Sequence, residues 1–237
     1  MNRKYIPIAI AVALALITAL VPRLPQDPAY HHFADTRAML GVPNALDVLS
    51  NVPFLLIGVL GLRLRPRETG FYFCFAGIAL TAFGSAWYHL NPNNATLVWD
   101  RLPMAVGFMG LLDAVIAERI SERAAMLWLT PLLCLGAGSV IYWQARDDLR
   151  PYVLVQFGPL VLIAAMVALF PSRQRPVTPY VLILGWYVVA KILEAADAQV
   201  YALGEIVSGH TLKHLAAAWA CYEIVRMVAR QQSVEPA

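Results

Sequence analysis

The chain has 237 residues, of which 59% are hydrophobic and only 14% are charged. Soluble domains carry about 25% charged residues, so this composition excludes an ordinary soluble protein and indicates a membrane protein. The net charge is +3 and no run of basic residues occurs, so we expect no nucleic-acid partner. The three cysteines lie in apolar stretches and are typical of small buried hydrophobic residues rather than of a disulfide framework.

The first apolar stretch covers residues 5–21 and follows Arg3 and Lys4. It is long for the core of a signal peptide, and no small-x-small cleavage pattern follows it. We therefore expect residues 1–22 to form an N-terminal transmembrane helix or signal anchor. Residues 23–46, rich in Pro, Asp, His and Asn, form a polar segment that we place on the extracytoplasmic side.

Seven further apolar stretches follow, each close to the roughly 20 residues that a bilayer requires. They cover residues 47–64, 70–90, 100–117, 124–142, 152–170, 179–196 and 207–228. The predicted fold is therefore all-α: a polytopic transmembrane helix bundle with a seven-helix core, residues 47–230, plus one additional N-terminal helix. We find no sequence repeat and no second domain.

The distribution of Arg and Lys between the loops predicts the orientation. If the N-terminus is cytoplasmic, most loop Arg and Lys residues fall on the cytoplasmic side, as the positive-inside rule requires. The C-terminus is then cytoplasmic as well. Five polar residues from three predicted spans come to the outer face at one depth: Ser85, His89, Asp100, His210 and His214.

These residues are suited to a metal-dependent hydrolytic site. His210 and His214, four residues apart on a helix, lie on one face and can share a metal ion. His89 would complete three protein ligands and leave a fourth tetrahedral position for water, which is the pattern of catalytic zinc. Such water ionises near pH 7. Because Thr211 follows His210, the H-E-x-x-H pattern is absent, and Asp100 is the remaining candidate for the base.

Each candidate also has a simpler interpretation. Ser85 lies one turn from His89 and can donate to an oxyanion or orient a ligand, but it can equally bond its own helix. Asp100, followed by Pro103, also fits a helix N-cap. The His31-His32 pair is a rival ligand set, although no predicted helix orients it.

Other ionisable residues lie within or beside the predicted spans. Lys191 and Glu194, three residues apart, are expected to neutralise each other and face the bundle interior. Asp113 is also expected to face inward. We expect Lys213 to point away from the metal, because a cation beside a cation is unfavourable.

The pattern resembles the alkaline ceramidase family, within the superfamily that includes the progestin and adiponectin receptor-type proteins. The resemblance covers about residues 44–230. The residues that carry it are Ser85-x-x-x-His89, Asp100 followed by Leu102-Pro103-Met104, Gly209-His210-x-x-x-His214, and Ser50-Asn51.

This resemblance implies a zinc-dependent hydrolase of linear amides. It implies that His89, His210 and His214 bind Zn²⁺, that Asp100 activates the water, and that Ser85 supports the oxyanion or the metal. The substrate would be a ceramide-type N-acyl membrane lipid, released as a sphingoid base and a fatty acid. The family also has an acidic Ca²⁺-binding segment. Here that acidic run is missing, and the candidates for Ca²⁺ are Asp35, Asn44 and Asp47.

Two other functions remain open on the sequence alone. The superfamily includes receptors, so the chain can be a receptor or regulatory membrane protein with structural zinc. A small transporter is the other alternative, with Asp113, Lys191 and Glu194 as its polar path.

Overall fold

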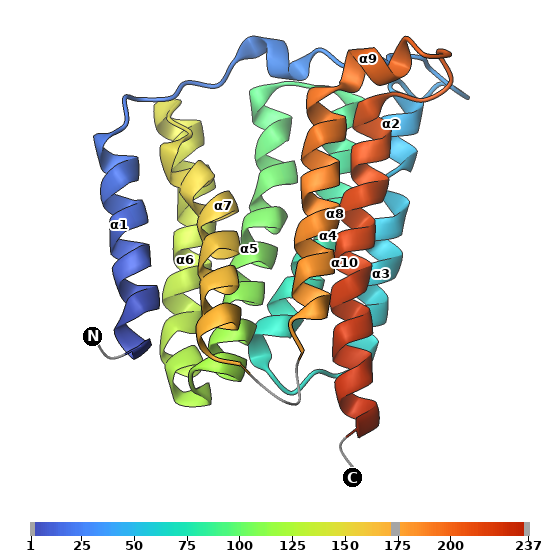
Figure 1. Cartoon of the computed structure of the whole chain (residues 1–237). Coiled ribbons are helices and arrows are strands. Elements are labelled where there is room, and N and C mark those ends of the chain that lie inside the picture. The colour runs from blue at the N-terminus through green and yellow to red at the C-terminus, as the bar shows by residue number, and fades with distance from the viewer. Residues whose placement is uncertain (1–2, 172–175, 235–237) are drawn as a thin grey trace.

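The computed structural model describes residues 3–171 and 176–234, and it confirms an all-α bundle (Figure 1). The helices are α1 (Ile6–Leu20), α2 (Ala45–Leu49), α3 (Val52–Arg63), α4 (Thr69–Leu90), α5 (Asn94–Arg119), α6 (Glu122–Arg146), α7 (Arg150–Leu169), α8 (Thr178–Ala195), α9 (Asp197–Tyr201) and α10 (Gly209–Val234), with short 3₁₀ turns at Arg3–Tyr5 and Pro28–His31.

The long helices run side by side, and their connections gather at the two ends of the bundle (Figure 1). Helix α1 begins, and α10 ends, at the same end. Residues 21–44 cross the opposite end, where the short helices α2 and α9 also lie (Figure 1). Helix α1 packs against α7 at the edge of the bundle, so the polar segment must span the full end of the bundle to reach α2.

Five described helical segments are long and apolar enough to cross a membrane: Ala45–Arg63, Thr69–Leu90, Glu122–Arg146, Arg150–Leu169 and Thr178–Ala195. Helices α5 and α10 are not among them; α5 includes Asp100 and Asp113, and α10 includes Lys213 and Glu223. The bundle therefore has the helices of a multi-pass membrane protein, and the seven-plus-one count of spans stays a prediction.

Two predicted spans begin differently in the structure. The span expected at 47–64 is broken into α2 and α3, because the side chains of Ser50 and Asn51 both donate to the carbonyl oxygen of Asp47. The span expected from residue 100 begins at Asn94. There Asn93 forms a capping box with Thr96, so Asp100 is inside α5 and is not its N-cap.

Helices α4 and α5 approach each other closely through glycine. A Cβ atom added at Gly77 would lie 2.6 Å from the carbonyl oxygen of Pro103, and one at Gly84 would lie 1.9 Å from that of Trp99. Small residues allow helix backbones to pack at such short range. Because Gly84 precedes Ser85 and Trp99 precedes Asp100, this contact sets the distance between two of the predicted site residues.

Gly84→Ala should therefore destabilise the protein, because its new methyl group has to displace the backbone of α5. Overpacking of this kind costs about 1–3 kcal/mol, and we expect a lower midpoint of thermal unfolding in detergent. Gly138→Ala is the matched control, since nothing lies within 4 Å of a Cβ atom at Gly138. Equal unfolding midpoints for the two variants would contradict the close packing.

Candidate metal centre

His89, His210 and His214 form one buried cluster at the end of the bundle crossed by residues 21–44. One ring nitrogen from each can be chosen so that all three lie within 4.8 Å of one another. The ring centroids are 4.9 Å apart for His89–His210, 5.0 Å for His89–His214 and 4.9 Å for His210–His214. Among the residues described, no other group of His, Cys, Asp or Glu has this geometry.

The orientation of His214 is set by Ser50, at the break between α2 and α3. The hydroxyl of Ser50 donates to the carbonyl oxygen of Asp47 at 2.9 Å and lies 2.7 Å from Nδ1 of His214. A hydroxyl has one proton to donate, so Nδ1–H of His214 is the donor to Ser50. This tautomer leaves Nε2 of His214 free to bind a metal ion.

The first turn of α10 is fixed by two aspartates. Asp197, at the start of α9, accepts hydrogen bonds from the backbone N–H groups of His210 at 2.7 Å and Ala34 at 2.9 Å. Asp47 accepts a hydrogen bond from the Thr211 hydroxyl at 2.6 Å. These contacts join the polar segment, α2 and α9 to the helix that carries two of the three imidazoles.

Phe33 covers the cluster from the polar segment. Its ring centroid lies 4.7 Å from that of His89 and 4.5 Å from that of His210. Asn44, in the left-handed conformation, donates from its side-chain amide to the carbonyl oxygen of His89 at 2.7 Å. Phe33 and Asn44 therefore cover His89 near the end of α4, and His89 is only 1% exposed.

The residues present fit a metal ion. All three imidazoles are at most 5% exposed, and Nδ1 of His89 is buried with no hydrogen-bond partner among the described residues. A buried polar atom without a partner is costly, and coordination to a metal ion would satisfy it. Three neutral imidazoles are a ligand set typical of zinc.

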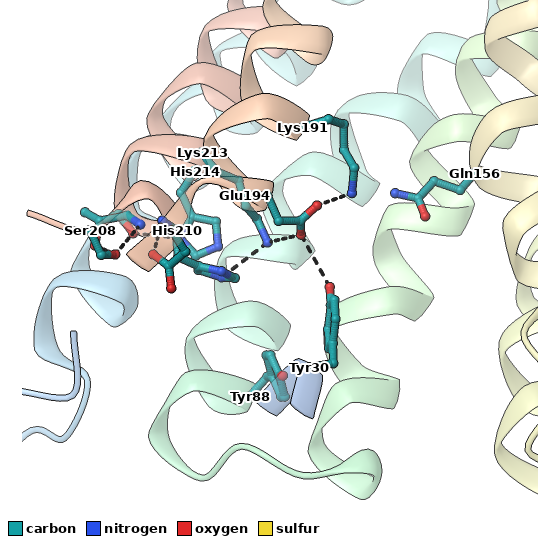
Figure 2. A network of polar contacts seen from close by, with 12 residues as sticks. Tyr30, Tyr88, Gln156, Lys191, Glu194, Ser208, His210, Lys213 and His214 are labelled. Carbon is teal, nitrogen blue, oxygen red and sulfur yellow. Dashed lines mark hydrogen bonds and ion pairs between the residues drawn. The ribbon is translucent and has the colours of Figure 1, made fainter. Parts of the chain in front are cut away.

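The prediction that Lys213 points away from the cluster is wrong. Figure 2 shows its side chain directed inward, where Nζ lies 3.2 Å from Nε2 of His210 and donates to Glu194 Oε1 at 2.9 Å. Glu194 also pairs with Lys191, as expected from their spacing (Figure 2). Repulsion between Lys213 and a metal ion was expected to keep this side chain away from the cluster. It lies there nevertheless, because the carboxylate of Glu194 offsets the charge of Lys213.

Ser85 and Asp100 lie beside the cluster, on the wall of a cavity. Ser85 is buried, and its hydroxyl is within hydrogen-bonding reach of the half-buried Asp100 carboxyl. The cavity has a volume of about 270 Å³, and its wall also includes His214. Away from these residues it is lined by apolar side chains of α4, α5, α7, α8 and α10, including Ile78, Met104, Phe108, Leu160, Ile183 and Ile224.

The three calcium candidates have other partners in the structure. Asp35 forms hydrogen bonds of 2.8 and 2.7 Å with the guanidinium of Arg37, and this pairing holds the pKa of the Asp35 carboxyl below its usual value. Asn44 is bonded to the carbonyl of His89, and Asp47 to Thr211. Oδ2 of Asp47 is buried without a hydrogen-bond partner among the described residues, and calcium binding stays a prediction.

His31 is tied to the ends of α4 and α5 rather than to the cluster. Its ring nitrogens lie 2.9 Å from the Tyr88 hydroxyl and 2.9 Å from Oδ1 of Asn94. The sequence reasoning did not identify Phe33 or Asp197. Neither has a local signal, because Phe33 reaches the imidazoles and Asp197 reaches α10 only through the folding of the loops.

The comparisons with known proteins add no family. No protein-family model matches the chain, and no curated protein matches it significantly.

The purified protein should contain about one transition-metal ion per chain, bound by the three imidazoles. His89→Ala, His210→Ala and His214→Ala should each lose it, because two remaining ligands hold zinc weakly. Metal analysis by mass spectrometry measures this directly. His32→Ala is the control, since His32 is exposed and outside the cluster; equal metal content in all four variants would contradict the site.

Ser50→Ala should weaken metal binding about 10- to 100-fold while leaving the three ligands in place, because the tautomer of His214 is no longer fixed. Titration with a competing chelator gives the affinity. Ser139→Ala removes another buried hydroxyl, which bonds only its own helix at Gly136, and should leave the affinity unchanged.

Proposed function

We propose that the chain is an integral membrane, zinc-dependent hydrolase that cleaves the amide bond of a ceramide-type N-acyl lipid. The observation that carries this proposal is the buried cluster of three imidazoles, with Asp100 and Ser85 beside it on the wall of an apolar cavity. The resemblance of these residues to the alkaline ceramidase pattern supports the same reaction class.

His89, His210 and His214 would hold the zinc ion. When bound, zinc supplies a Lewis acid that polarises a carbonyl and lowers the pKa of water to about 7. The side chains around it would orient the substrate: the Ser85 hydroxyl, now within hydrogen-bonding reach of Asp100, would turn from that carboxylate to donate to the carbonyl oxygen of the amide, and the apolar wall would exclude bulk water.

Asp100 is the group suited to move the proton. It would accept a proton from the attacking water and deliver it to the amine as the C–N bond breaks, so that fatty acid and amine leave. Glu194 lines the same cavity but is paired with both Lys191 and Lys213. A carboxylate held by two ammonium groups is a weaker base than one held by a hydroxyl.

A lipid substrate accounts for the cavity and its place in the bundle. The polar groups lie at one end of the helices and the apolar lining extends along them, which matches an amide near the headgroup level with its acyl chain in the membrane. With the termini in the cytoplasm, as the loop charges predict, the site would face the extracytoplasmic side.

The transporter alternative receives no support from the placement of its residues. Asp113 is buried between α4 and α5, where a Cβ atom at Gly70 would lie 2.8 Å from its carboxyl, and it does not line the cavity. It therefore forms no continuous polar path with Lys191 and Glu194. The receptor alternative has the same zinc site as the hydrolase but negligible amide hydrolysis.

Asp100→Asn should retain the metal and lower the rate of amide cleavage at least about 100-fold, because general acid–base catalysis contributes 10²–10⁴-fold. The rate is measured as fatty acid released from a panel of labelled N-acyl lipids, ceramide included. Asp113→Asn is the control, since it removes a buried carboxylate outside the cavity and should leave the rate unchanged.

One result would contradict the hydrolase, and another would contradict the role of Asp100. If the metal-loaded wild type releases fatty acid from none of the lipids, the receptor alternative gains. If Asp100→Asn cleaves as fast as the wild type, the proton is moved by another group.

A further inference from the structure

Arg101 is a buried cation without an ion-pair partner among the described residues. Its residue is 5% exposed, and one guanidinium nitrogen donates to the side-chain oxygen of Gln26 at 2.8 Å. The guanidinium carbon lies 4.2 Å from the ring centroid of Trp143 and 4.7 Å from that of Tyr152. Nη1 is buried without a hydrogen-bond partner, and no carboxylate of the described residues forms an ion pair with this side chain.

The cavity beside the three imidazoles carries an excess of positive charge. Arg101, Lys191 and Lys213 line it, together with only two carboxylates, Asp100 and Glu194. Both lysines pair with Glu194, so one carboxylate serves two ammonium groups. A metal ion held by the imidazoles would increase the excess. An anion entering this cavity would therefore be attracted.

Tyr30 connects the arginine with the lysines. The guanidinium of Arg101 lies 5.4 Å from the ring centroid of Tyr30, whose hydroxyl donates to Glu194 Oε1 at 3.5 Å. The same oxygen accepts from Lys213 (Figure 2). Tyr30 and Glu194 thus join the three cations into one part of the cavity wall, and His214 also lines the cavity.

We propose that this wall binds a carboxylate on the amine side of the substrate, so that the cavity accepts an N-acyl amino acid. The inference rests on the proposed amide hydrolysis and names its substrate class. The acyl chain would occupy the apolar part of the cavity, the amide would lie at Ser85 and Asp100, and the carboxylate would reach Arg101.

The chemistry of the guanidinium favours a carboxylate over a neutral head group. Its planar donors match two carboxylate oxygens, and such charge-assisted bonds are roughly twice as strong as neutral ones. The hydroxyl groups of a ceramide would give Nη1 of Arg101 a partner but no counter-charge. Burying an uncompensated cation is expensive, so a neutral ligand would leave that cost in place.

The test is equilibrium binding to the full chain in lipid nanodiscs, with ligands that cannot be cleaved. Two analogues share one acyl chain and have a methylene group in place of the amide nitrogen; one ends in a carboxylate and the other in a hydroxyl. We expect the carboxylate analogue to bind at least about tenfold more tightly, within the range of a charge-assisted hydrogen bond. Equal affinities would overturn the proposal.

Substitutions assign the preference to Arg101. In Arg101→Gln the affinities for the carboxylate and hydroxyl analogues should differ by no more than about twofold. Arg101→Lys, which keeps the charge, should retain part of the preference for the carboxylate analogue. Arg123→Gln is the matched control because Arg123 is exposed on α6 and outside the cavity. If Arg101→Gln does not fold, Lys213→Gln should reduce the same preference. If Arg101→Gln or Lys213→Gln folds and keeps the full preference for the carboxylate analogue, the assignment of the carboxylate site to this wall is wrong.

A free fatty acid is the other source of a carboxylate. If oleate binds as tightly as the carboxylate analogue and loses that affinity in Arg101→Gln, then Arg101 binds the acyl end and the proposal is wrong. Because binding is measured without turnover, the result is independent of hydrolysis. A carboxylate preference in a protein that cleaves no amide would overturn the hydrolase alone.

Discussion

Polar groups enclosed in an apolar bundle must find their partners inside it, and this requirement shapes one whole end of the structure. Three histidines are buried there, and each has a hydrogen bond, through its ring or its backbone, to a residue from another part of the chain. Ser50 binds His214, and Asp197 binds the backbone of His210. The break between α2 and α3, the helix α9 and the loop carrying Phe33 are therefore parts of the site.

The same requirement separates the two carboxylates of the cavity. Glu194 is enclosed by two lysines and the Tyr30 hydroxyl, so it serves to hold those cations in place. Asp100 has no lysine or arginine within ion-pair distance among the described residues. It is therefore free to exchange a proton. The different tasks that we propose for these two acids therefore follow from their neighbours rather than from their identity.

The sequence predicted the helix bundle and the meeting of His89 with His210 and His214, because the apolar stretches define the helices and the alternating direction of the helices brings these residues to one end of the bundle. It placed the start of α4 at residue 70, where the helix begins at Thr69, but it missed the break between α2 and α3 and the start of α5. The start of α5 depends on a capping box at Asn93, and a later Asp-Pro signal at residues 100–103 competed with it. It also misplaced Lys213, since one-dimensional spacing shows that two cations are close but not that Glu194 from another helix lies between them. Contacts made by loops, such as that of Phe33, have no periodic signal at all.

The charge of the cavity bears on which amphiphile can occupy it. A neutral lipid would satisfy the apolar lining and place its amide beside Asp100, yet Arg101 would remain a desolvated cation between Trp143 and Tyr152. Aromatic faces offset part of that cost, but they provide no opposing charge. A ligand with a carboxylate near its amide supplies that charge and leaves the acyl chain in the apolar lining. In the proposed complex, the two ends of the cavity would bind the two ends of one molecule, and the amide bond that joins them would lie beside the imidazole cluster.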